Sequence, residues 1–186
     1  MRVIVIVVFA LQLFSCANIS EKKELSFDLE GREYLYEKEK WSFLGKIALS
    51  NEKDAVSASI AWDHLNKKET IELVGLFGMG RTRISLRDEQ ININVGEENK
   101  TYYGDVNDII SSRLGVEVPL SALRYWVLGL VDPRAGFRPI EKGFEQYGWQ
   151  VTFSQMQKQG GNKLPRKVKV ERDMARVKLF IKRWDI

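Results

Sequence analysis

The strongest constraint on the fold of this chain is an alternation of apolar and polar side chains that starts at Trp41 and recurs as far as Val95. The alternating segments are 41–50, 55–62, 71–73, 82–87 and 91–95. Alternation that is broken by a turn every 8–12 residues or so is typical of antiparallel sheets that bury one face. We therefore predict an antiparallel sandwich or barrel wall here, with turns at 64–67 and 88–89.

Beyond Val95 the apolar spacing changes from that of strands to that of helices. Residues 105–115 have apolar side chains at helical spacing, with Asp105 or Asn107 as the cap, and a second helix opens at Pro119 and ends at Gly129. Strand-like alternation returns at 148–155, 165–173 and 175–184. A chain of 186 residues fits a single domain. The prediction is one strongly curved antiparallel sheet with a helical insertion between its halves.

The N-terminus differs in kind from the rest of the chain. Arg2 precedes an apolar run from Val3 to Leu11, which Gln12 interrupts. This run is shorter than the roughly 20 apolar residues that span a bilayer. A short cationic region followed by a short apolar region is typical of a secretory signal, which we predict over residues 1–15.

The sequence Leu13-Phe14-Ser15-Cys16 contains the only cysteine and is similar to a bacterial lipobox. A lone cysteine in an exported chain cannot form an internal disulfide, so it is either lipidated or a free reactive thiol. We interpret Cys16 as the lipid attachment site, with a tether over 16–36 and the folded domain over 37–186. Ala17 stands where Asp would favour retention in the inner membrane, which indicates the outer membrane, facing the periplasm.

The charge distribution does not favour nucleic-acid binding, because the formal net charge is only +4. Basic residues concentrate in 163–183. On strands such a pattern is usually one solvated face. Contact with anionic headgroups or with an acidic partner is the open alternative.

No residue pattern indicates an enzyme, a metal site or a cofactor. Residues 75–82 come within one substitution of a phosphate-binding loop, but a strand pattern follows where that loop needs a helix. His64 is the only histidine and falls in a predicted polar turn, so a His-based triad or a multi-histidine zinc site lacks its parts. The adjacent acids at 88–89 and 97–98 are typical of solvated turns.

The stretch GLFGMG at 75–80 has the glycines of a turn but carries Leu76, Phe77 and Met79. Turns normally present Asn, Asp or Ser instead. Two interpretations stay open from the residues alone. The apolar tip dips into a membrane, or Phe77 folds back and plugs the barrel.

The segment VPLSALRYWVLGL at 118–130 resembles a helix of the outer-membrane lipoprotein receptor family LolB. The residues that carry this resemblance are Pro119, Leu120, Leu123, Arg124, Trp126, Leu128, Gly129 and Leu130. Residues 76–80 resemble the family's protruding Pro-Leu-Gly-x-Gly loop, with Leu76 and Phe77 departing from the usual Pro and Leu. The order of elements agrees over essentially the whole mature chain.

The resemblance implies an incomplete antiparallel β-barrel closed by helices around a hydrophobic cavity. It also implies a monomeric receptor that accepts the acyl chains of lipoproteins from the periplasmic carrier LolA and inserts these lipoproteins into the outer membrane. Leu76, Phe77 and Met79 would then form the membrane-insertion loop. We expect the cavity or its lid to use Trp41, Phe43, Ile60, Trp62, Leu120, Leu123 and Trp126. The alternative is a lipoprotein without transfer activity that acts as a structural or assembly partner.

Overall fold

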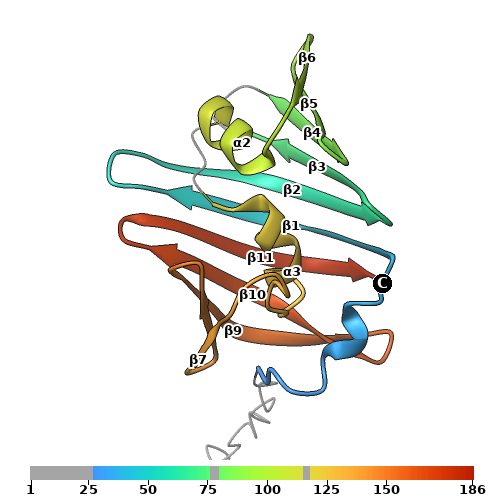
Figure 1. Ribbon diagram of the computed structural model, residues 1–186, viewed down its shortest axis with the longest axis vertical. Coiled ribbons are helices and arrows are strands. Elements are labelled where there is room, and N and C mark those ends of the chain that lie inside the picture. Colours follow the sequence, from blue (N-terminus) through green and yellow to red (C-terminus); the bar gives the residue numbers. More distant parts are fainter. Residues whose placement is uncertain (1–26, 76–79, 115–117) are drawn as a thin grey trace, which may run out of the picture.

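A computed structural model of the chain describes residues 27–75, 80–114 and 118–186. In these residues one eleven-stranded antiparallel sheet curves around two short helices (Figure 1). The strand order is β6-β5-β4-β3-β2-β1-β11-β10-β9-β8-β7. The predicted fold class, a curved antiparallel sheet with a helical insertion, is confirmed.

The element bounds follow the chain order. The first half of the sheet consists of β1 (Lys40–Ser50), β2 (Ala55–Leu65), β3 (Lys68–Val74), β4 (Arg81–Arg87), β5 (Gln90–Val95) and β6 (Glu98–Tyr103). The helices are η2 (Glu33–Leu35), α2 (Val106–Leu114) and α3 (Leu120–Trp126). The second half of the sheet consists of β7 (Arg138–Ile140), β8 (Gly143–Gln146), β9 (Trp149–Gln159), β10 (Asn162–Arg172) and β11 (Ala175–Asp185).

The two halves of the sheet join where β1 pairs with β11. The register of this pair shifts between Leu44 and Gly45, and a Cβ at Gly45 would lie 2.4 Å from the carbonyl oxygen of Phe180. A second irregularity in register, near Pro165, occurs where β10 pairs with β9. Such bulges bend a strand and increase its twist. They account for a sheet that wraps around the helices while its edges, β6 and β7, stay apart.

The cap of α2 follows its predicted signal, while α3 ends at Trp126 and the predicted Gly129 lies in the turn that follows it. The Asp105 carboxylate accepts hydrogen bonds from the backbone N–H groups of Asn107 (2.8 Å) and Asp108 (3.1 Å), which caps α2. After α3 the chain turns at Gly129, whose φ is +76°, and Leu130 N–H donates to the carbonyl of Tyr125 (3.1 Å). This is a Schellman-type ending, which needs a left-handed residue at the position of Gly129.

The predicted turn at 64–67 is wrong in its first half. Strand β2 continues through His64 to Leu65, and the chain reverses at Asn66, whose φ is +54°. Polar character suggested a turn, but the His64 ring stacks on Trp41 with 5.1 Å between centroids, which keeps it in the strand. The turn at 88–89 is confirmed, with Asp88 at a φ of +53°.

Strands β6, β7 and β8 were not predicted. Strand β6 is a largely exposed edge strand with no buried face, so its sequence ENKTYY has no alternation to detect. Strands β7 and β8 span only three and four residues. Strands as short as β7 and β8 depend on pairing next to strand β9 more than on the pattern of their own residues.

Residues 27–36 pack against the sheet. The Phe27 ring stacks on Phe153 at 4.1 Å between centroids, and Leu35 is buried. The proposed limits of the signal, tether and domain concern processing and anchoring of the chain, and they stay predictions.

Candidate functional site

An apolar cavity of about 50 Å³ lies between the first half of the sheet and the helices. Strands β1 to β4 and β11 supply Ile47, Leu49, Ile60, Trp62, Ile71, Leu73, Ile84 and Val177, and the helical side supplies Ile110, Val118, Leu120 and Leu123. The alternation in the strands places these side chains on the inner face. A space of this size holds one or two water molecules and is far smaller than an acyl chain.

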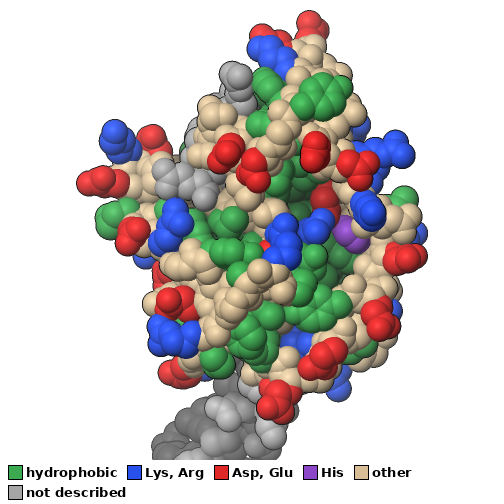
Figure 2. Space-filling view, in the orientation of Figure 1, with side chains coloured by type: hydrophobic (Ala, Val, Ile, Leu, Met, Phe, Trp, Pro, Cys, Tyr) green, Lys and Arg blue, Asp and Glu red, His purple; other side chains and the backbone are tan. Residues whose placement is uncertain are grey.

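A larger cavity of about 510 Å³ lies beside it, at the C-terminal end of α3. Its walls are the 35–39 segment, the start of β1, the β2–β3 turn and the end of α3. Trp41, His64, Arg124 and Tyr125 are among its lining residues. Figure 2 shows hydrophobic side chains along a hollow on this face, with cations and the histidine at its rim.

A buried carboxylate organises the polar wall of the larger cavity. Glu69, only 4% exposed, accepts a hydrogen bond from Trp62 Nε1 at 2.7 Å through one oxygen. Its other oxygen lies 2.8 Å from His64 Nδ1 and 3.7 Å from Arg124 Nη1. Trp62 lines the apolar cavity, whereas His64 and Arg124 line the larger one, so the contacts of Glu69 connect the walls of the two cavities. The Glu69 cluster, defined here as Trp62, His64, Glu69 and Arg124, thus joins β2 and β3 to α3.

Arg32 holds the C-terminal end of α3. Its guanidinium donates to the carbonyls of Leu128, Gly129 (3.1 Å) and Lys163 (2.9 Å). A cation near the last carbonyls of a helix satisfies unpaired acceptors and suits the helix dipole. Burial lowers the pKa of Arg32, although the side chain keeps its charge.

Gln146 fixes the segment after α3 from the other side. Its side-chain oxygen accepts from Trp126 Nε1 (2.9 Å) and the Asp132 N–H (2.8 Å), and its amide donates to the carbonyls of Asp132 (2.8 Å) and Ala135 (2.9 Å). Gln146 is 2% exposed, so all these bonds are shielded from water. The end of α3 is therefore tied to the second half of the sheet.

The structure separates the predicted cavity residues into three groups. Ile60, Trp62, Leu120 and Leu123 line the apolar cavity, and Trp41 lines the larger one. Phe43 packs in an aromatic cluster with Trp184, and Trp126 is fully buried against Gln146.

Four predicted site residues, Cys16, Leu76, Phe77 and Met79, lie outside the described residues, and their roles stay predictions. The base of the predicted loop is described. Gly75 N–H donates to the Gly80 carbonyl at 2.8 Å, and both glycines have positive φ.

Sequence reasoning missed Arg32, Glu69 and Gln146 as site residues. A signal for Glu69 was present, because it is in phase with Ile71 and Leu73 and so had to point inward. A charged residue at an inward position needs a partner. Arg32 and Gln146 carry no comparable pattern, since their partners are backbone groups distant in sequence.

Solved structures share this architecture. A DUF1329 family protein from Desulfovibrio piger superposes with a TM-score of 0.54 at 7% identity, over 82% of this chain and 88% of that one. A LolA superfamily protein from Nitrosomonas europaea gives a TM-score of 0.51 at 8% identity, over 78% of this chain and 86% of that one. These likenesses show a shared fold, a curved sheet wrapped around helices.

The sequence comparisons are more specific. A family model described as outer membrane lipoprotein LolB matches residues 39–184. Relatives named outer-membrane lipoprotein LolB include one from Marinomonas sp. (28% identical, 79% of this chain, 80% of the relative) and one from Pseudomonas fluorescens (31% identical, 77% of this chain, 73% of the relative). This chain belongs to the LolB family of outer-membrane lipoproteins, as the resemblance predicted. Among the described residues, no helix has the length and apolar character needed to cross a bilayer.

Proposed function

We propose that this protein accepts the acyl chains of lipoproteins from a periplasmic carrier of the LolA type and delivers them to the outer membrane. The observation that carries the proposal is an inner face whose cavity is lined by apolar side chains alone, beneath a lid of two helices. Membership of the LolB family supports the same function.

Transfer of an acyl chain needs such a surface because water penalises the chain. At about 0.8 kcal/mol per CH₂, a chain of about 16 carbons loses on the order of 10 kcal/mol in water. An apolar cavity offsets much of this loss, and a bilayer offsets all of it. We propose that the cargo moves toward the environment that binds its acyl chains more strongly, from carrier to receptor to membrane. No nucleotide is needed at these steps.

The cavity of about 50 Å³ requires that the lid moves before an acyl chain enters. Helix α2 is the part of the lid best suited to move, because Ile110 is the only fully buried side chain among those described on it. Asn107 and Ser121 are hydrogen-bonded to each other through two contacts (3.1 and 3.3 Å), which couples α2 to the start of α3. The end of α3 stays tied by Arg32 and Gln146. The proposed opening is therefore at the α2 side, over β3 and β4.

The proposed delivery element is the apolar tip formed by Leu76, Phe77 and Met79. The hydrogen bond between Gly75 and Gly80 brings the two ends of this segment together, and Val74 beside it is 45% exposed. Burying a Phe side chain in lipid gains roughly 1.5–3 kcal/mol. We propose that this tip enters the bilayer and starts release of the cargo.

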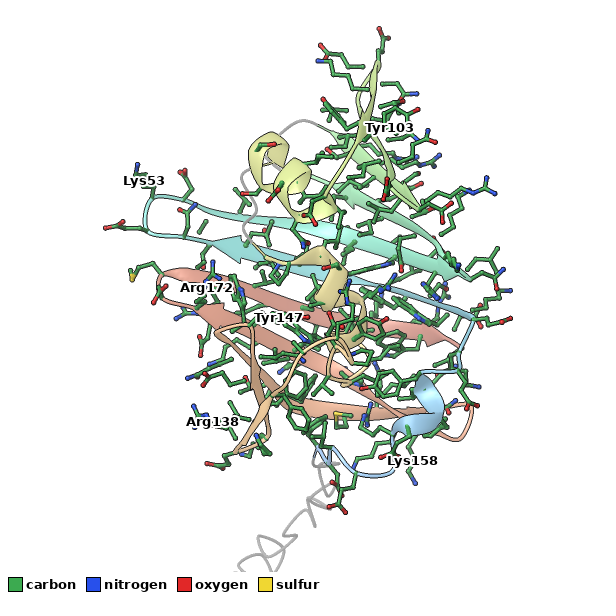
Figure 3. The ribbon with its side chains drawn as sticks, in the orientation of Figure 1. Lys53, Tyr103, Arg138, Tyr147, Lys158 and Arg172 are labelled. Carbon is green, nitrogen blue, oxygen red and sulfur yellow. The ribbon has the colours of Figure 1, made fainter. Side chains whose placement is uncertain are left out.

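The test of delivery is Phe77→Glu in the lipidated full-length protein. Purified carrier loaded with a labelled lipoprotein is mixed with the variant bound to vesicles, and label is followed from carrier to receptor and from receptor to lipid. We expect normal acceptance and strongly reduced delivery. Tyr103→Glu is the matched control, because Tyr103 is exposed on the edge strand β6, as Figure 3 shows. Unimpaired delivery by Phe77→Glu would exclude the tip from this role.

The second candidate function is a lipoprotein without transfer activity that binds a protein partner through the same fold. The small volume of the apolar cavity favours it, since a filled interior needs no ligand. A Cys16→Ala chain, which cannot be lipidated, separates the two functions when it is mixed with loaded carrier. Capture of the labelled lipoprotein supports transfer. A stoichiometric protein complex without bound acyl chains supports the alternative.

A further inference from the structure

The Glu69 cluster lies where the apolar cavity meets the larger polar one. Leu123 lines the apolar cavity, and the next residue on α3, Arg124, lines the larger cavity. Trp62 lines the apolar cavity and donates to Glu69. An acyl chain that lies in the apolar cavity would therefore have its polar end beside Arg124.

Arg124 has hydrogen-bond donors that the described residues do not use. A guanidinium carries five N–H donors. Nη2 donates to the Tyr125 hydroxyl at 3.2 Å, and Nη1 is 3.7 Å from Glu69, which is too long for a hydrogen bond. Nε is buried and has no hydrogen-bond partner among the described residues. The Arg124 side chain as a whole is 33% exposed and lines the larger cavity, so its guanidinium can donate to an oxygen acceptor there, and a hydrogen bond to a charged donor is stabilising.

The surroundings of Arg124 select a neutral acceptor over a second anion. The Glu69 carboxylate already lies close enough to balance the charge of Arg124, and its two oxygens are held by Trp62 and His64. His64 is held in turn by the ring of Trp41. An incoming carboxylate or phosphate would meet the field of Glu69, whereas a carbonyl oxygen carries only a partial charge.

We propose that Arg124 and the larger cavity bind the carbonyl oxygens of the ester and amide groups at the head of an acylated cysteine. This inference rests on the proposed function and adds a polar recognition site to the apolar one. The cavity of about 510 Å³ leaves room for the head of the lipid beside α3. Recognition of the head distinguishes lipoprotein acyl chains from bare hydrocarbon.

The competing explanation is that Arg124 only holds the lid against Glu69. A lid contact affects every apolar ligand alike, whereas a carbonyl site affects only ligands that have carbonyls. The Cys16→Ala chain is therefore tested with two probes. One is a synthetic cysteine peptide with ester-linked palmitoyl chains, and the other is the ether-linked analogue, which lacks those carbonyls.

We expect the protein with Arg124 to bind the ester probe about ten-fold more tightly than the ether probe. The ether probe lacks the carbonyl that would accept a hydrogen bond from this charged donor. Arg124→Met should reduce ester affinity to that of the ether probe and leave ether affinity unchanged. Arg83→Met, on the exposed face of β4, is the control and should change neither affinity.

Three outcomes overturn the inference. Equal weakening of both probes by Arg124→Met means that Arg124 acts only on the lid. Equal affinity of the unchanged protein for the two probes means that carbonyls are not recognised, while the proposed function stands. If the unchanged protein binds neither probe, the proposed function itself is contradicted. Thermal unfolding tests whether Arg124→Met folds. If it does not fold, Arg124→Lys takes its place and should also reduce the difference in affinity between the ester and ether probes.

Discussion

The two halves of the sheet bury their inner faces differently. In the first half, the inner side chains of Ile47, Ala58 and Leu73 are 6–8% exposed and border the apolar cavity or lie near it. In the second half, Phe144, Val151 and Val170 are 0% exposed and belong to the buried core, and the Phe144 ring lies 6.3 Å from the ring of Phe137 in the segment after α3. The same strand pattern therefore gives a filled core on one side and a lined space on the other.

This difference shows which half is tied more firmly, and the opening that we propose lies in the other half. Arg32 and Gln146 tie the second half to the end of α3 through buried hydrogen bonds. The first half is covered by α2, on which Ile110 is the only fully buried side chain among those described. The proposed receptor function needs both properties, because a lid can move reversibly only when other contacts hold the domain together.

The largest effect is expected from Gln146→Leu in the second half. The change removes the hydrogen-bond partners of Trp126 Nε1, the Asp132 N–H and the Ala135 carbonyl, while the Asp132 carbonyl still accepts from the Ala135 N–H. Each buried unpaired group costs about 1–3 kcal/mol. We expect a loss of about 3–5 kcal/mol in the free energy of unfolding, measured with urea. Gln150→Leu, exposed on β9, is the matched control. A loss below about 1 kcal/mol would mean that the second half does not hold the fold.

An intermediate effect is expected from adding volume to each half. Ile71→Phe adds a ring beside the cavity, so we expect a stability loss under about 1 kcal/mol together with loss of acyl-probe binding. Val170→Phe adds the same kind of ring to the filled half, where overpacking costs about 1–3 kcal/mol. Urea unfolding and a fluorescent fatty-acid probe measure both quantities. Equal stability losses in the two variants would contradict the comparison.

The smallest effect is expected from the acid dependence of the second half. Burial disfavours the charged form of Asp132, but hydrogen bonds from Arg134 and Tyr147 outweigh it, so the pKa of Asp132 lies below its usual value. The stabilisation is complete above the unfolded pKa of about 3.9 and is lost as pH falls through the lower folded pKa. Unfolding free energies at pH 7 and pH 3 should therefore differ less in Asp132→Asn than in the unchanged protein. An identical pH dependence in the variant and the unchanged protein would show that ionisation of Asp132 does not stabilise the fold.

Much of the fold could be predicted from particular residues. Alternation placed the inward side chains of β1 to β5, and Asp105 and Pro119 placed the helix starts. The position of His64 could not be predicted, because its strand conformation depends on stacking against Trp41 from a neighbouring strand. The functional roles of the predicted cavity residues stay predictions. In the structure Ile60, Trp62, Leu120 and Leu123 line the apolar cavity and Trp41 lines the larger one, whereas Phe43 and Trp126 are buried and line neither.

The sequence by itself determined the curved antiparallel sheet, the helical insertion and the family, because periodicity, caps and motif residues act over short distances along the chain. Only the tertiary structure decided which half is filled, how small the space under the lid is, and that Glu69 meets Arg124. Those features depend on contacts between residues far apart in the chain, such as Arg32 with Gly129. Their volumes and distances follow from how the whole sheet curves, which no local pattern specifies.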